Sequence, residues 1–161
     1  MAVTLSIVGT ANSGKTTLIT QLIPRLKAFG FKVGVIKHTA HGFEMDHEGK
    51  DSWKHQQAGA DAVMVASDTA FALVKRVTPV SLEELEAQMG DLDLIVTEGY
   101  KMSKRPKLAV HRKETGKKPL TDLPHLVARV SDGPAIDDLP NLPLNDPDSV
   151  ARFIVDNFLS A

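Results

Sequence analysis

The sequence predicts an α/β fold in which helices flank a mostly parallel, mixed central sheet. Short apolar segments of strand length alternate along the chain with longer segments that have helical periodicity. The apolar segments are continuous, which is typical of parallel strands covered on both faces. Two of the strand-like segments, residues 61–66 and 70–75, are separated by Ser67-Asp68-Thr69 and favour a hairpin. The hairpin is the reason to expect a mixed sheet.

Composition restricts the class of protein. The length of 161 residues is that of one globular domain, so we expect a single domain over 1–161. The absence of cysteine excludes disulfides, thiol nucleophiles and cysteine-ligated metals. A net charge of -1, from 19 Lys+Arg against 20 Asp+Glu, argues against a general nucleic-acid binder. The apolar runs are too short for a membrane span and the N-terminus does not resemble a secretory signal, so a cytoplasmic protein is expected.

The first elements in order are a strand, a glycine-rich loop and a helix. A β-branched apolar run over residues 3–8 ends at Gly9, and apolar residues at helical spacing follow the loop. Pro24 lies inside the predicted helix, where it lacks an N–H donor, so we expect a kink or an early end there. The next segments predict a strand at 32–37, a polar loop at 38–48 and a short polar helix at 49–58.

The second half of the chain continues the alternation. Ser81, with Glu84 three residues later, has the form of a capping box and predicts a helix from about 82 to 89. Asp146-Pro147 combines an N-cap acid with proline at the first helical position, which predicts a last helix. Further strands are predicted at residues 92–97, 108–111 and 126–130.

The loop after the first strand matches the phosphate-binding pattern G-x-x-x-x-G-K-[ST], in the strand–loop–helix context that the pattern requires. Its backbone N–H groups and the helix N-terminus would surround a phosphate. Lys15 would contact the β and γ phosphates, and the Thr16 hydroxyl would bind Mg²⁺. A P-loop NTPase fold is therefore expected. The expected nucleotide contacts are Gly9, Thr10, Ala11, Asn12, Ser13, Gly14, Lys15, Thr16 and Thr17.

Acidic residues that would complete a magnesium site follow other predicted strands. Glu98 comes directly after an apolar run, at the strand end where α/β folds place their sites, and with Lys15 it forms the predicted catalytic pair. The alternative for Glu98 is a solvated carboxylate without a role. Asp46 and Asp51, in and after the polar loop, are further candidate metal ligands. The alternative for Asp51 is that it only stabilises the start of the following helix.

Residues 101–118 contain eight of the 19 basic residues and a single acid, Glu114. This segment favours an anion: a phosphorylated small molecule, the acidic face of a partner or the phosphates of the nucleotide. A merely solvated basic edge stays open as well. The scarcity of aromatic residues argues against nucleic acid. The usual guanine-reading signature N/T-K-x-D is absent, and Asp132, after the strand at 126–130, is predicted to contact the base instead.

Together these segments resemble the molybdopterin-guanine dinucleotide biosynthesis protein B family. The similar stretches are GTANSGKTT (9–17), VIKHTAH (35–41), Asp46 with GKDSWKHQQAGA (49–60), and DLIVTEGYK (93–101). The resemblance implies a GTP-binding adaptor with weak GTPase activity that forms a homodimer. Residues 9–17 and Glu98 would be its nucleotide motifs, and Lys37-His38 with residues 46–52 would sense the nucleotide or a partner. It also implies a partner, the molybdenum cofactor guanylyltransferase that attaches GMP to molybdopterin, and molybdopterin-bearing proteins as further candidates.

The residues themselves leave two other functions open. A small-molecule kinase would prefer ATP and would use residues 101–118 as a lid, with Arg105 and Arg112 closing on the transferred phosphoryl group. A binding module would hold the nucleotide only as a structural ligand. Because no Gln or Arg is evidently placed to orient an attacking water, slow unaided hydrolysis is expected.

Overall fold

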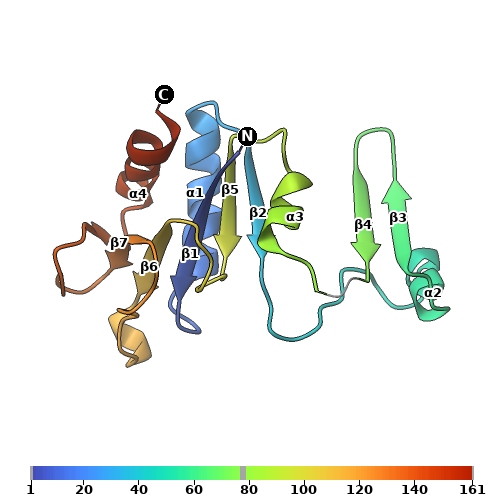
Figure 1. Ribbon diagram of the computed structural model, residues 1–161, viewed down its shortest axis with the longest axis horizontal. Coiled ribbons are helices and arrows are strands. Elements are labelled where there is room, and N and C mark those ends of the chain that lie inside the picture. The colour runs from blue at the N-terminus through green and yellow to red at the C-terminus, as the bar shows by residue number, and fades with distance from the viewer. Residues whose placement is uncertain (1, 77–78, 161) are drawn as a thin grey trace. The chain divides into compact units, whose positions relative to one another are not determined.

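The computed structural model describes residues 2–76 and 79–160, which form two compact units (Figure 1). The first unit contains the described residues up to His38 and from Leu82 onward, and the second runs from Thr39 to Ser81. The candidate phosphate loop and Glu98 belong to the first unit, whereas Asp46 and Asp51 belong to the second. The single domain over 1–161 stays a prediction.

The first unit is built around a six-stranded sheet whose strand pairs are all parallel. The strand order is β2-β5-β1-β6-β7-β8. All six carboxyl ends therefore lie at one edge, where ligands of α/β folds bind. The strands are β1 (Val3–Gly9), β2 (Val33–Lys37), β5 (Leu94–Glu98), β6 (Lys107–His111), β7 (Leu126–Ser131) and β8 (Asn141–Pro143).

Helices cover both faces of this sheet, which confirms the predicted fold class (Figure 1). On one face, α1 (Lys15–Ala28) and α4 (Pro147–Ile154) bury the larger apolar cluster. On the other face, α3 (Leu82–Ala87) covers a smaller cluster that contains Ile36 and Ile95. This second face also buries polar side chains: Thr4, Ser6, Thr97, Lys107 and Arg129 are at most 6% exposed. Buried polar groups need partners, and those of the two buried cations lie in loops. Lys107 donates to the carbonyl oxygens of Ser103 and Arg105, and Arg129 pairs with Asp137 and donates to the carbonyl oxygen of Leu120.

Several boundaries differ from the sequence prediction. The helix α1 continues four residues beyond Pro24, so the early end expected there does not occur. The helix α3 is shorter than predicted, because Gln88 and Met89 bond to carbonyls three residues back and tighten its last turn. The strand β8 was not predicted. Two further short elements are the 3₁₀ turn η1 (Lys113–Thr115), between β6 and β7, and the π-helical η2 (Val155–Leu159), which continues α4.

The second unit contains the helix α2 (Asp51–Gln57) and the predicted hairpin, formed by β3 (Ala62–Ala66) and β4 (Phe71–Lys75). The two strands pair antiparallel only with each other, so the hairpin forms a separate sheet and does not make the central sheet mixed. The Ser67 hydroxyl accepts the N–H groups of Thr69 and Ala70 and fixes the turn. Within the described residues, no helix combines the length and the apolar character that crossing a membrane requires.

Candidate functional site

The loop between β1 and α1 has the backbone of a phosphate-binding loop. Asn12 and Gly14 adopt left-handed conformations, with φ of 64° and 94°. A Cβ on Gly9 would lie 2.6 Å from the carbonyl oxygen of Val110, so only glycine fits where the loop leaves the sheet. The Ser13 hydroxyl is fully buried and has no hydrogen-bond partner in the described part of the chain. The first N–H groups of an α-helix have no intrahelical partners, so those of α1 are available as donors to an anion.

Lys15 bends back over this loop. Its Nζ donates to the carbonyl oxygens of Gly9 at 3.1 Å and of Thr10 at 2.7 Å. Burial lowers the pKa of Lys15, the carboxylate of Glu98 raises it, and three neighbouring ammonium groups lower it further. Those three groups belong to Lys37, Lys101 and Lys117. Positive charge is therefore concentrated at the loop, as a polyphosphate ligand requires.

Glu98 lies at the carboxyl end of β5, beside the loop. The Thr16 hydroxyl donates to Glu98 Oε1 at 2.8 Å, and the Lys37 ammonium lies 3.9 Å from the same oxygen. Strand register produces this meeting, since Glu98 pairs with Ile7 of β1 on one side and with Lys37 of β2 on the other. A hydroxyl and a carboxylate at hydrogen-bond distance are hard oxygen donors, which fit Mg²⁺.

The backbone directly after Glu98 is strained. Gly99 and Tyr100 both have positive φ, of 108° and 55°, which is unfavourable for a tyrosine. The Tyr100 ring packs at 4.8 Å from the ring of His38, and burial raises the pKa of Tyr100. The His38 N–H donates to the Glu98 carbonyl oxygen at 3.0 Å. These contacts hold the end of β5 in place.

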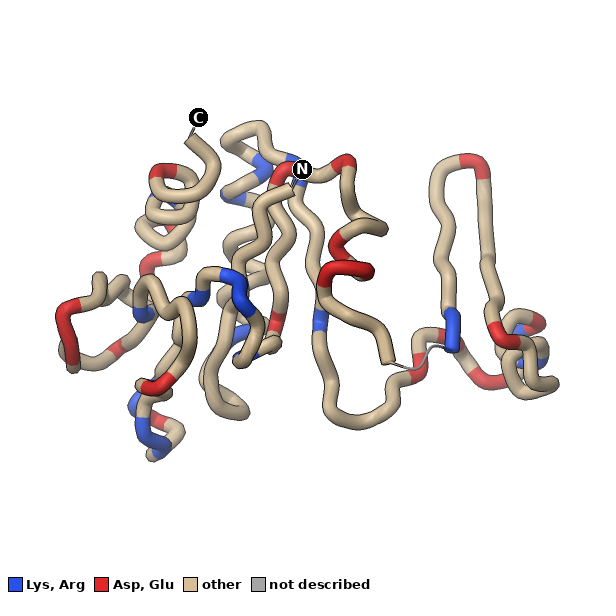
Figure 2. Tube along the Cα trace, in the orientation of Figure 1, with Lys and Arg blue, Asp and Glu red and all other residues tan. Residues whose placement is uncertain are grey.

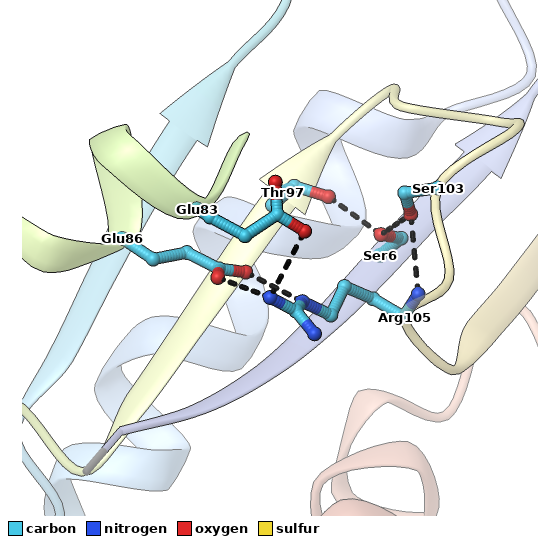
Figure 3. A network of polar contacts seen from close by, with 6 residues as sticks. All are labelled: Ser6, Glu83, Glu86, Thr97, Ser103 and Arg105. Atoms are coloured by element: carbon cyan, nitrogen blue, oxygen red, sulfur yellow. Dashed lines mark hydrogen bonds and ion pairs between the residues drawn. The ribbon is translucent and has the colours of Figure 1, made fainter. Parts of the chain in front are cut away.

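The segment from Ser103 to Lys107 is anchored to the sheet and to α3 (Figure 3). Arg105 forms a bidentate ion pair with Glu86, in which the Arg105 Nε lies 2.8 Å from Oε1. The Arg105 Nη2 also lies 3.5 Å from the Glu83 carboxylate. The fully buried Lys107 donates to the carbonyl oxygens of Ser103 and Arg105, and burial lowers the pKa of Lys107. Arg105 is thus occupied in holding this loop, which does not favour a kinase lid that closes on a phosphoryl group.

A hydroxyl chain continues this anchoring into the sheet. Thr97 donates to the Ser6 hydroxyl at 2.8 Å, and the Ser6 and Ser103 hydroxyls lie 3.5 Å apart (Figure 3). Ser6 and Thr97 are fully buried on neighbouring strands, β1 and β5. These three hydroxyl groups therefore connect β1 and β5, the strands that lead to the phosphate loop and to Glu98, with the loop that joins β5 to β6.

The end of the basic segment lies at the phosphate loop itself. The Arg112 guanidinium lies 3.2 Å from the point that a Cβ on Gly14 would occupy. The Lys117 ammonium lies 3.5 Å from the carbonyl oxygen of Ala11. Figure 2 shows basic residues around the η1 turn that follows β6. Asp132, at the end of β7, accepts the backbone N–H of Lys113 at 2.8 Å and so joins the ends of β6 and β7.

Comparison with known proteins identifies the family. The family model described as Molybdopterin guanine dinucleotide synthesis protein B matches residues 4–132, which include the phosphate loop, Glu98 and Asp132. The chain belongs to the MobB family. Two relatives are named as molybdopterin-guanine dinucleotide biosynthesis adapter proteins. The one from Haemophilus influenzae is 39% identical over 93% of this chain and 86% of its own length. The one from Escherichia coli is 38% identical over 94% and 91%.

Solved MobB structures have the same fold. A crystal structure of molybdopterin-guanine biosynthesis protein B is 31% identical, covers 96% of this chain and 97% of its own, and has a TM-score of 0.73. A Bacillus subtilis MobB structure is 25% identical, covers 98% and 99%, and has a TM-score of 0.76.

In this MobB-family chain the other two predicted metal ligands have local partners in the second unit. Asp46 accepts the N–H of His47 at 2.8 Å and lies 3.4 Å from the Gln56 amide. Hydrogen bonds from the Ser52 side chain and from the His47 N–H lower the pKa of Asp46. Asp51 is the first residue of α2 and pairs with Lys54 at 3.3 Å. Its position fits the alternative in which Asp51 stabilises the start of this helix.

Sequence reasoning named Lys37 through the family resemblance and placed Lys101 and Lys117 in the basic segment, but it did not predict that the three surround Lys15. Lys37 and Lys101 approach Lys15 from the ends of β2 and β5, and Lys117 approaches from the loop after β6. The signal that would have placed Lys37 there is its position as the last residue of a predicted strand, next to the strand end that drew attention to Glu98. Lys101 and Lys117 lie in irregular loops, where no sequence periodicity indicates which way a side chain points.

Proposed function

We propose that this chain binds GTP with Mg²⁺ at residues 9–17 and acts as an adaptor in molybdopterin guanine dinucleotide biosynthesis. In this role it assists the guanylyltransferase that joins GMP to molybdopterin, with molybdopterin-bearing proteins as further candidate partners. The contact between Thr16 and Glu98 beside Lys15 carries the proposal, because it assembles hydroxyl, carboxylate and ammonium at one phosphate loop. The names of the relatives support the biosynthetic role.

Each residue has a distinct proposed task. The loop amides and Lys15 bind the phosphates, Thr16 and Glu98 hold Mg²⁺, and Asp132 contacts the base. Bound magnesium would neutralise charge on the β and γ phosphates. Asp46 and Asp51, which belong to the second unit, stay candidate metal ligands. Lys15 and Glu98 are the proposed catalytic residues.

Unaided hydrolysis should be slow. Water would form a bond to the γ phosphorus while the bond to the β–γ bridging oxygen breaks, and the positive charges around Lys15 would stabilise the developing charge. Arg105, a candidate source of further charge, is held by Glu86. We therefore expect turnover well below about 10 s⁻¹, the median for enzymes, in the absence of a partner.

The hairpin supports the proposed homodimer. Met64, Phe71 and Leu73 are 57%, 73% and 46% exposed and lie on one face, because Met64 pairs with Leu73 and Phe71 with Ala66. A two-stranded sheet is only marginally stable alone in water, and an exposed apolar face favours association. We propose that a second copy covers this face in a cytoplasmic homodimer, without nucleic acid or membrane as partner.

An assay of dinucleotide formation tests the adaptor function. The transferase is given molybdopterin and GTP, alone or with this protein as wild type, as Lys15→Ala, or as Lys27→Ala, which changes an exposed lysine in the last turn of α1, at the opposite end of that helix from the phosphate loop. We expect wild type and Lys27→Ala to raise the yield of molybdopterin guanine dinucleotide and Lys15→Ala to lose the effect. An equal yield with and without the wild-type protein would contradict an adaptor role.

A further inference from the structure

The two sides of the phosphate loop have different chemistry. The strand β5 neighbours β1 on one side and carries Glu98, which contacts Thr16. The strand β6 neighbours β1 on the other side, and Arg112 follows its last residue. Carboxylate and hydroxyl oxygens thus lie toward β5, whereas a guanidinium lies toward β6.

This asymmetry orients a bound nucleotide. A magnesium ion held by Thr16 and Glu98 belongs with the β and γ phosphates, so that end of the ligand lies toward β5. The α phosphate and the nucleoside then extend toward the ends of β6 and β7. Arg112 is therefore on the nucleoside side of the loop, away from the phosphate that hydrolysis removes.

Neighbouring residues fix the backbone of Arg112 by hydrogen bonds, and its guanidinium is left available for a ligand. The Arg112 carbonyl oxygen accepts the N–H of Thr115 at 3.2 Å and its hydroxyl at 2.8 Å. The next residue, Lys113, donates its N–H to Asp132. Over residues 2–76 and 79–160, no ion pair engages the Arg112 guanidinium, in contrast to Arg105 and Arg129. The residue is also only partly exposed.

Gly14 explains why the guanidinium approaches the loop so closely. Arg112 Nη2 lies 3.2 Å from the position of a Cβ that Gly14 lacks, and its Cζ lies 3.7 Å from it. The planar, weakly hydrated guanidinium can stack on an aromatic ring, which a lysine ammonium cannot do as a plane. A purine extending from the loop toward β6 would meet this group directly.

We propose that Arg112 is a nucleobase-binding residue whose guanidinium packs against the base of the nucleotide bound at residues 9–17. The inference rests on the proposed nucleotide binding and deepens it by naming the surface on which the base lies. Asp132, joined to the Arg112 turn through Lys113, is placed to read the edge of the same base. Arg112 and Asp132 together form the base-binding wall at the ends of β6 and β7.

Titration with two probes that share phosphates but differ in the base tests this role. The wild-type protein and the variants Arg112→Ala, Arg112→Lys and Lys27→Ala are titrated calorimetrically with GTP and with inorganic tripolyphosphate, each with Mg²⁺. Lys27 is an exposed lysine in the last turn of α1, at the opposite end of that helix from the phosphate loop. Base stacking is worth about 1–3 kcal/mol, so Arg112→Ala should weaken GTP binding by roughly 5- to 150-fold. Tripolyphosphate affinity should change less than about twofold, because the probe has no base to stack.

The Arg112 variants distinguish stacking on the base from electrostatic attraction of the phosphates. Arg112→Lys keeps the charge but loses the planar group, so it should weaken GTP binding nearly as much as Arg112→Ala. Lys27→Ala should bind GTP like wild type. Equal losses for GTP and tripolyphosphate would overturn the inference and assign Arg112 to the phosphates. Unchanged GTP affinity in both Arg112 variants would also overturn it. Failure of the wild-type protein to bind either probe would instead overturn the proposed nucleotide binding, and the inference with it.

Discussion

The Thr16 hydroxyl donates a 2.8 Å hydrogen bond to Glu98, although 82 residues separate them along the chain. The parallel pairing of β1 with β5 produces this contact, because it aligns Glu98 with Ile7 shortly before the phosphate loop. These are the two side chains that we propose as ligands of Mg²⁺. This pair is the geometric centre of the candidate site.

The variant Glu98→Gln should uncouple magnesium from nucleotide binding. An amide keeps a hydrogen-bond acceptor for Thr16 but removes the negative charge that a divalent cation requires. We expect GTP affinity of wild type to rise markedly when Mg²⁺ replaces EDTA, and that of Glu98→Gln to rise much less. Thr16→Ser, which keeps the hydroxyl, is the matched control. A magnesium effect of the same size in Glu98→Gln would exclude Glu98 as a ligand.

The pair of Arg105 and Glu86 should contribute to stability in a pH-dependent way. Burial raises the pKa of Glu86, but hydrogen bonds from Arg105 and Thr4 and the charge of Arg105 outweigh it, so the pKa of Glu86 is lowered below its usual 4.5. The stabilisation is therefore present above pH 4.5 and is lost as the pH falls through the lowered pKa. We expect Glu86→Gln to lose about 1–2 kcal/mol in the free energy of unfolding at pH 7.

Denaturant unfolding at several pH values measures this effect. The gap between wild type and Glu86→Gln should narrow progressively below pH 4.5. Glu83→Gln is the control, because the Glu83 side chain is 68% exposed and 3.5 Å from Arg105, and such surface pairs contribute little. A constant gap from pH 7 down to pH 3 would show that the charge of Glu86 is not responsible.

Gly9→Ala should damage both the loop and the fold. The added Cβ would lie 2.6 Å from the Val110 carbonyl oxygen and 2.5 Å from the Ser13 hydroxyl, so the backbone of β1 or β6 would have to move. We expect a loss of roughly 1–3 kcal/mol in stability, together with loss of nucleotide affinity. Gly42→Ala, which adds a methyl group to open space, should unfold like wild type. Thermal unfolding and GTP titration of the two variants decide the matter.

The proposed dimer depends on the apolar face of the hairpin. Phe71→Asp places a charge on the face that a second copy would cover, so the protein should shift from dimer to monomer in light scattering. Phe43→Asp is the matched control, because Phe43 is 68% exposed in the same unit but lies outside both strands. A Phe71→Asp protein that keeps the dimer mass would remove the hairpin from the interface.

Sequence patterns predicted the elements better than their assembly. The run from Leu94 to Thr97 identified β5 because buried strands are continuously apolar, and the acid after it was found for the same reason. The hairpin was also identified correctly, but local alternation cannot tell which sheet a strand joins, so its separation from the central sheet was unexpected. The strand β8 has only three residues and contains proline, which leaves too little pattern to detect.

In the candidate site, too, local features were predicted from the sequence and contacts between distant segments were not. The glycine and lysine spacing of residues 9–17 identified the loop, because the phosphate geometry is encoded locally. The approach of Arg112 to Gly14 arises from the pairing of β1 with β6, more than 90 residues away, which no local pattern reports. Sequence reasoning grouped Arg105 and Arg112 together, as basic residues and as the two arginines of a possible kinase lid. The structure separates them into a loop anchor and a neighbour of the phosphate loop.

Calorimetric titration of the purified protein with GTP and with ATP, each with Mg²⁺ and each repeated with Lys15→Ala, tests the central claim most directly. The account predicts that GTP binds more tightly than ATP and that Lys15→Ala loses this binding while it unfolds at the same temperature as wild type. Equal affinity in Lys15→Ala would contradict phosphate binding at this loop. Equal or tighter binding of ATP would contradict the assignment of GTP and favour a kinase.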